Sequence, residues 1–187
     1  MSKVYSDFEL DQMGIKLEGS ENYIAVNCVG SSEEEMDTRV ITKNCRGTVA
    51  KTIVRGTGTG KLKLKAHIPY DVYVGFFGME LDSLMEGVKA YGRNSKHKGF
   101  AVTQHVVDED GIVKLKAYPN CIMTSGVARK IENGATEVAE LELEADIMPD
   151  EYGNGMYEVL EADLSDATVK EQWMTAFTPD MVQVNAA

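Results

Sequence analysis

Residues 53–69, IVRGTGTGKLKLKAHIP, contain the pattern on which the interpretation of the fold depends. In the second half, apolar Leu62, Leu64, Ala66 and Ile68 alternate with polar Lys61, Lys63, Lys65 and His67. A period of two predicts a half-buried strand. The first half places Gly56, Gly58 and Gly60 among threonines. We therefore expect a hairpin over 48–68, with strands at 48–55 and 61–68 and a flexible tip at 56–60.

The same glycines resemble a phosphate-binding loop, but the match fails. A P-loop needs Ser or Thr after its Gly-Lys pair to hold Mg²⁺, whereas Leu62 follows Gly60-Lys61 here, and Arg55 stands where the first glycine belongs. A dinucleotide loop would need glycine at Lys61. Both kinds of loop open a helix, while a strand pattern follows here. No nucleotide site is predicted.

Composition sets the class of protein. The chain has 187 residues, 43% of them hydrophobic, and a net charge of −11. We expect one domain, 1–187, with a substantial core. Because the net charge is strongly negative, we expect no basic surface for binding DNA, RNA or anionic lipid. We expect no membrane span, and MSKVYSDFEL has no apolar signal core. Three cysteines without a C-x-x-C pair predict reduced thiols, as in a cytoplasm.

Strand patterns occur through most of the chain. Residues 136–148, TEVAELELEADIM, are the most regular, with apolar residues alternating with Glu140, Glu142, Glu144 and Asp146. Residues 99–107 and 112–118 flank Asp110-Gly111, a strong hairpin signal, and Pro119-Asn120 then bends the chain. Asn133-Gly134 predicts another turn. Further strands are expected at 22–29, 88–92 and 156–161.

Residues 31–47, SSEEEMDTRVITKNCRG, are polar and show no clear period. They predict a long connection, and long connections inside compact domains are often functional. The candidate contact residues of segment 31–47 are Glu33, Glu34, Glu35, Asp37 and Arg39.

One helix is expected at 168–177. Thr168 and Glu171 have the spacing of a capping box, and Val169, Trp173 and Phe177 lie on one stripe. Residues 70–77 fit a short helix or a strand, and 79–86 fit a helical turn or a structured loop. The predicted fold is mainly β: two packed antiparallel sheets, as a sandwich or open barrel, with one or two short flanking helices and a long hairpin.

The sequence predicts no catalytic, cofactor or metal residues. The row Glu140, Glu142, Glu144 and Asp146 lies on an extended strand, whereas calcium sites fold their oxygen ligands around a turn. DEDG at 108–111 lacks the terminal glutamate of an EF-hand loop, and no G-x-S-x-G elbow is present. We expect the chain not to be an enzyme.

Four stretches, in order, are similar to major tail tube proteins of long-tailed bacteriophages. They are GTGTGKLKLKAHIPYDVYVGFFGM (56–79), VKAYGRNSKHKGFAVTQHVVDEDGIVKLKAYPNC (88–121), NGATEVAELELEADIMPDEYGNGMYEVLEA (133–162) and VKEQWMTAF (169–177). Together they cover most of the chain after residue 47. The resemblance lies in the order of these four stretches and in their residue patterns, and it includes no catalytic motif.

This resemblance implies hexameric rings that stack into a tube through which DNA travels. It also implies a hairpin from each subunit that joins its neighbours in a continuous β-barrel lumen. Other expected partners are tape measure, terminator and baseplate proteins, with assembly in the bacterial host cytoplasm and a place in the virion tail. Segment 31–47 is then the candidate ring-stacking loop. Candidate inter-subunit hairpin residues are Thr48, Ile53, Gly56, Gly58, Gly60, Lys61, Lys63 and Lys65.

Two alternatives remain open. The tube of a phage-tail-like bacteriocin or injection machine would share this fold, and a monomeric β-sandwich that binds a small ligand belongs to another class. A tube that passes DNA must not hold it, so we expect a neutral or negative bore. Lys61, Lys63 and Lys65 should face away from it or lie beside the carboxylates of 140–144. Segments 31–47 and 56–60 should be mobile in a free subunit and ordered in the tube.

Overall fold

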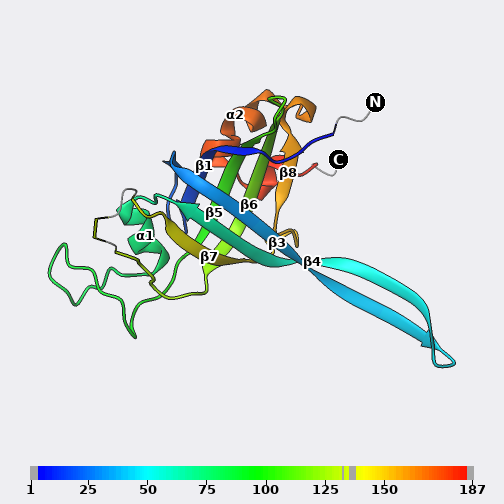
Figure 1. Ribbon diagram of the computed structural model, residues 1–187, viewed down its shortest axis with the longest axis horizontal. Helices are drawn as coiled ribbons and strands as arrows, with labels where there is room; N and C mark the ends of the chain where they lie inside the picture. The colour runs from blue at the N-terminus through cyan, green and yellow to red at the C-terminus, as the bar shows by residue number, and fades with distance from the viewer. Residues whose placement is uncertain (1–3, 132, 135–137, 185–187) are drawn as a thin grey trace.

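The described residues form one antiparallel sheet of eight strands with two α-helices. The computed structural model describes residues 4–131, 133–134 and 138–184. The strand order is β2-β1-β5-β6-β7-β4-β3, and β8 pairs with β6 off this path. The elements are β1 Glu9–Leu17, β2 Ile24–Val26, β3 Val29–Cys45, β4 Thr48–Ala66, α1 Tyr70–Phe76, β5 Gly99–Val107, β6 Val113–Met123, β7 Leu141–Ile147, β8 Tyr157–Leu160 and α2 Ala167–Ala176 (Figure 1).

The sheet curls into an open barrel. In the strand order, β6, β7 and β4 lie between β5 and β3. Even so, Gln104 Nε2 of β5 donates a hydrogen bond to Ser32 Oγ of β3 at 2.7 Å. The mainly β, antiparallel class is confirmed. The two packed sheets are replaced by one continuous sheet, because every neighbouring pair along the path is hydrogen-bonded.

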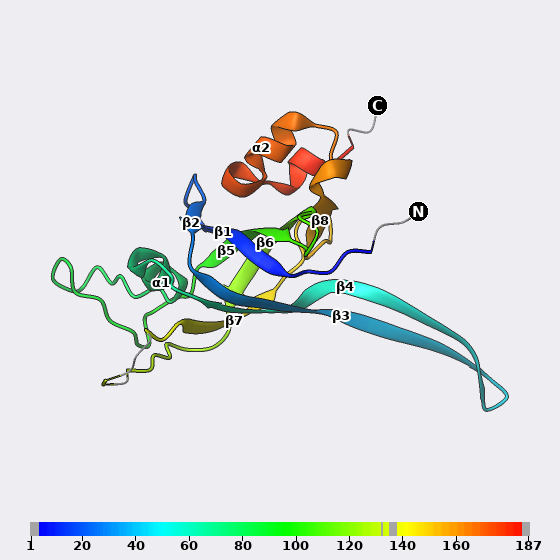
Figure 2. The same ribbon diagram turned by 45° about the horizontal axis from the view of Figure 1, so that its top comes forward.

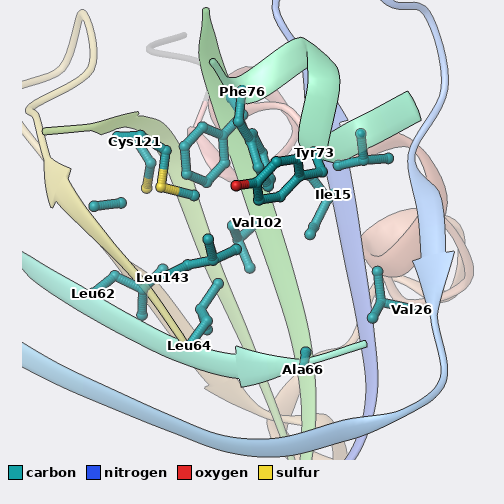
Figure 3. Packing of buried hydrophobic residues seen from close by; sticks show 14 of the residues in the cluster. Ile15, Val26, Leu62, Leu64, Ala66, Tyr73, Phe76, Val102, Cys121 and Leu143 are labelled. Carbon is teal, nitrogen blue, oxygen red and sulfur yellow. The ribbon is translucent and has the colours of Figure 1, made fainter. Parts of the chain in front are cut away.

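The main core fills the inside of the curl. Alternation on β4 turns Leu62 and Leu64 inward, and Leu143 of β7 joins them (Figure 3). Tyr73 and Phe76 of α1 pack onto the same cluster. Helix α1 begins after Pro69, because proline cannot continue the strand ladder but suits a helix start. The helix alternative for 70–77 is therefore correct.

Helix α2 covers the other face of β6 (Figure 2). Trp173 and Phe177 pack on Leu115 and Ala117, and Trp173 Nε1 donates to the Lys116 carbonyl at 3.1 Å. The helix at 168–177 is confirmed, but its predicted capping box is wrong. Asp166 caps it instead, since its side chain accepts from the backbone N–H groups of Thr168 and Val169.

Some predicted strands change their limits. The hairpin of 99–107 and 112–118 is confirmed, but β6 continues through Pro119-Asn120 to Met123, and a register shift opposite Ala101 absorbs the bend. Residues 88–92 form no strand; Ala90 N–H bonds back to the Met79 carbonyl. Strand β7 alternates as predicted, over 141–147 only; residues 136 and 137 lie outside the described part.

Candidate functional site: the arm of the β3–β4 hairpin

The outer part of the β3–β4 hairpin projects far from the rest of the molecule (Figures 1 and 2). We call Thr38–Gly56 the arm and the remaining described residues the body. Strands β3 and β4 pair from Val29↔Ala66 to Cys45↔Thr48. Only Gly60–Ala66 of β4 also pair with β7. The arm is therefore a two-stranded ribbon without a third strand.

The tip of the hairpin is Arg46-Gly47. Both residues have positive φ, 52° and 79°, as a two-residue turn of the primed type requires. The prediction of 31–47 as a connection is therefore wrong, because β3 runs through it. The predicted hairpin over 48–68 with its tip at 56–60 is also wrong, since Thr48–Ala66 form one strand, β4, whose hairpin partner is β3. The missed signal is the β-branched content of TRVIT at 38–42, which faces TIV at 52–54.

The glycine-rich stretch forms a bulge at the root of the arm. Met36 pairs with Gly60 and Thr38 with Gly56, so Asp37 alone faces three residues of β4, 57–59. Thr59 Oγ1 donates to Asp37 Oδ2 at 2.9 Å, and Thr57 Oγ1 to the Asp37 carbonyl at 3.2 Å. Gly58 adopts φ of 76°. These contacts define where the arm leaves the body.

The root also rests on the turn at 153–155. A Cβ on Gly58 would lie 2.5 Å from the Gly153 carbonyl oxygen, and one on Gly155 would lie 2.1 Å from the Gly58 carbonyl oxygen. Two backbones meet there, and only glycine permits such an approach. The direction of the arm is thus supported by the body.

One face of the arm is uncharged and apolar. The register pairs Val40 with Val54 and Thr42 with Thr52, and Val49 faces Asn44. The three valines are 58–59% exposed. Scattered exposed apolar residues are ordinary, but a row of β-branched residues on one strand face usually packs against something. Nothing in the described part of the subunit covers this row.

The opposite face of the arm is basic. The register places Arg39 opposite Arg55 and Lys43 opposite Lys51, with the pair Ile41 and Ile53 between them. None of these four cations takes part in an ion pair among the described residues. Like charges directly opposite each other on a sheet are destabilising.

The inner half of the hairpin has paired charges instead. Lys61 Nζ lies 2.8 Å from Glu144 Oε1 and 3.5 Å from Asp146, and Lys65 Nζ lies 2.8 Å from Glu142. Hydrogen bonding and charge raise the pKa of both lysines. The predicted placing of lysines 61 and 65 beside the 140–144 carboxylates is confirmed. Lys63 instead lies 3.7 Å from Glu33.

The residues predicted for the stacking loop separate into different surroundings. Glu33 and Glu35 lie exposed on β3. Glu34 turns inward and accepts a hydrogen bond from Lys116 Nζ at 2.7 Å. Asp37 belongs to the root and Arg39 to the arm. Their role in ring stacking stays a prediction.

Lys116 anchors the N-terminal segment to the hairpin. It is 5% exposed and also contacts Asp7 at 3.2 Å, while Lys114 contacts Asp7 at 2.9 Å. Burial acts to lower the pKa of Lys116, but the hydrogen bond and charge of Glu34, with Asp7, raise it overall. Burial likewise acts to raise the pKa of Asp7, and the two lysines lower it overall. This network holds three separate chain segments together.

Among the described residues, no three His, Cys, Asp or Glu side chains gather as ligands for a metal ion. Asp108 uses its carboxylate within its own turn, where it accepts from the N–H groups of Asp110 and Ile112. Cys121 is buried, and burial raises the pKa of its thiol to about 12. In the described part, neither helix has the length and hydropathy to cross a membrane.

No protein-family model matches the chain, and neither does any curated protein. Among solved structures, a chain of the anti-feeding prophage baseplate is similar, with 10% identity and a TM-score of 0.46 over 88% of this chain and 100% of that one. A chain of the anti-feeding prophage cap, a tube terminating cap, has 9% identity and a TM-score of 0.42 over 85% and 96%.

A chain of the sheath-tube complex of an extracellular contractile injection system, in its extended state, is also similar. Its identity is 11% and its TM-score is 0.42, over 81% of this chain and 90% of that one. At this level the similarity remains a likeness, and the function is inferred from the chain's own surfaces.

Proposed function

We propose that this chain is a structural subunit that assembles through its arm into hexameric rings, which stack into the tail tube of a bacteriophage. The tube of a phage-tail-like bacteriocin or injection machine would assemble in the same way but would carry another cargo. The arm carries this proposal, because it exposes an apolar row and two strand edges that the described part of the subunit does not pair.

Those features are unfavourable in an isolated subunit. A two-stranded ribbon is marginally stable in water. The second edge of β4 over 48–59 has no strand partner in the described residues, nor has the second edge of β3. Free edges pair readily with strands of another chain. Pairing with neighbouring copies would satisfy the backbone groups and cover Val40, Val49 and Val54 together.

The tube would conduct DNA without holding it. The three lysines of inner β4 have carboxylates within 4 Å, so they would add little attraction for phosphates if they faced the bore. We propose a neutral or negative bore. Tape measure, terminator and baseplate proteins would be the other partners, in a virion tail assembled in the host cytoplasm.

Light scattering after size-exclusion chromatography, with negative-stain images, tests the proposal over a range of concentrations. Wild-type protein is expected to form rings or tubes above a threshold concentration. Hydrogen exchange should show fast exchange for arm amides in the subunit and strong protection in the particle. A compact monomer at all concentrations, with equal arm protection throughout, would favour a monomeric ligand-binding protein instead.

The variant Val40→Thr/Val54→Thr removes the apolar row and keeps β propensity. It should raise the threshold concentration about tenfold or more, as the loss of buried apolar contacts predicts. Met85→Thr/Val88→Thr is the matched control, since both residues are exposed on the loop between α1 and β5. The control should assemble as wild type does.

A further inference from the structure

Charge is divided unequally between the arm and the rest of the chain. Between Thr38 and Gly56 there are five basic residues, Arg39, Lys43, Arg46, Lys51 and Arg55, and no acidic one. The whole chain carries −11, so the remainder carries −16. A positive ribbon on an acidic body suits a partner whose surface resembles that body.

The best match to the basic face lies on the same strand, nearer the body. Glu33 and Glu35 are exposed on inner β3, whose outer edge has no strand partner in the described residues. Glu33 is 73% exposed, and its ion pair with Lys63 is long at 3.7 Å. Glu35 faces Lys61 in register, but Lys61 contacts Glu144 and Asp146 instead. These two carboxylates therefore have capacity for another cation.

The two sets also lie on strand faces with the same period of two residues. Lys51 and Arg55 are four residues apart, on either side of Ile53, and Glu33 and Glu35 are two apart, so one direct charge pair and one diagonal pair can form. The alternation of β3 further places Glu33, Glu35, Arg39 and Lys43 on one face. Along this face, β3 is thus acidic near the body and basic toward the tip, while inner β4 carries Lys63 and Lys61 opposite Glu33 and Glu35.

We propose that the free edge of β4 over Lys51–Arg55 pairs with the free edge of β3 at Glu33 and Glu35 of a second copy. This inference rests on the proposed function and adds the surface, the acceptor and the direction of assembly. The contact is head-to-tail, because two arms side by side would bring like charges together. Head-to-tail contacts close into rings when the rotation permits.

Two charge-reversal variants test the pairing. Lys51→Glu/Arg55→Glu makes the arm acidic, and Glu33→Lys/Glu35→Lys makes the acceptor basic. Each alone should raise the threshold concentration for rings about tenfold or more, because breaking charge pairs across an interface is costly. Thermal unfolding of each subunit shows whether it is folded. Where Glu35→Lys weakens the fold, Glu33→Gln/Glu35→Gln replaces it and should have a smaller effect of the same sign.

Mixing the two reversed variants in equal amounts gives the decisive result. In an alternating ring, the acidic arm of one variant meets the basic acceptor of the other, and the two unchanged surfaces also meet. A ring with an even number of subunits should therefore form from the mixture although neither variant assembles alone. Arg93→Glu/Lys96→Glu and Glu109→Lys/Glu151→Lys make the same charge changes on exposed body residues, and each should assemble alone.

Several results would overturn the proposal. If the reversed variants assemble normally, or if the mixture does not restore rings, the pairing is wrong although the proposed function stands. If wild-type subunits bind a short DNA duplex at physiological salt, and the reversed arm loses this binding but still assembles, the arm binds nucleic acid instead. If the wild-type protein forms no ring at all, the proposed function fails and the pairing fails with it.

Discussion

The two halves of the β3–β4 hairpin share strands but differ in burial, strand pairing and charge pairing. In the inner half, Leu62 and Leu64 are buried, β7 adds a third strand, and lysines lie beside carboxylates. In the outer half, Val40 and Val54 are exposed, no third strand is described, and Arg39 faces Arg55. The inner half is completed by its own chain, whereas the outer half has the surface of an unfinished interface.

The largest expected difference comes from apolar truncation in each half. Leu64→Ala should lower the free energy of unfolding by about 2–5 kcal/mol, since Leu64 is 1% exposed in the core. Val54→Ala should change it by less than about 0.5 kcal/mol in the subunit. Urea unfolding followed by Trp173 fluorescence, below the assembly threshold, measures both. Equal losses would mean that the arm is already packed in the subunit.

At the root between the two halves, replacing one glycine should lower the free energy of unfolding, whereas replacing another should leave it nearly unchanged. Gly58→Ala should cost about 1–3 kcal/mol, because φ is 76° and the new Cβ would lie 2.5 Å from the Gly153 carbonyl oxygen. Gly56→Ala has open space within 4 Å and should be close to neutral. The same urea experiment compares them. A neutral Gly58→Ala would contradict the described contact with 153–155.

Acid should act on the body and spare the arm, which has no carboxylate. The pKa of Asp7 is lowered overall by Lys114 and Lys116, so folding is stabilised above its ordinary pKa. That contribution is lost as pH falls through the lower, folded pKa. Unfolding followed from pH 7 to pH 3 should show a shallower loss for Asp7→Asn than for the wild type. Parallel curves would exclude Asp7 from the acid response.

The smallest expected effect is a gain. Arg55→Glu turns a repulsive cross-strand pair with Arg39 into an attractive one, worth about 0.2–1 kcal/mol. Arm amides of the free subunit should exchange more slowly, while assembly becomes weaker. Hydrogen exchange and light scattering on one sample measure both. A variant that gains in both would show that the basic face serves only the subunit.

The inner half could be predicted from the sequence because burial of one strand face requires apolar residues at every second position. Alternation of Leu62 and Leu64 with lysines reports one buried face, and the matching acidic row around Glu142 and Glu144 predicts β7 as its neighbour. The arm leaves no such trace: both of its faces are exposed in the subunit, so 31–47 shows no apolar period. Its faces separate by charge, which becomes visible only once the register is known.

The glycines of 56–60 are the second feature that the sequence does not resolve. Three glycines in 56–60 fit a flexible tip, but the chain uses them for a bulge and for contact with Gly153 and Gly155, far away in sequence. Local composition contains no information about such a contact. Similarly, Thr168 fits a helix cap, yet Asp166 has the better reach to the first backbone N–H groups. Whether Thr48, Ile53 and the other hairpin residues meet a second subunit stays a prediction.

The pairing of β4 with β7 has a consequence for synthesis on the ribosome. Ala66 pairs with Leu141, so 75 residues must follow before inner β4 can gain its second neighbour. At about 5–20 residues per second, this takes roughly 4–15 s. During that time the hairpin, which needs only local contacts, is exposed with its β-branched rows. The five cations of the arm then lie within an aggregation-prone segment, where charges oppose aggregation, and we expect arms of neighbouring nascent chains to repel one another.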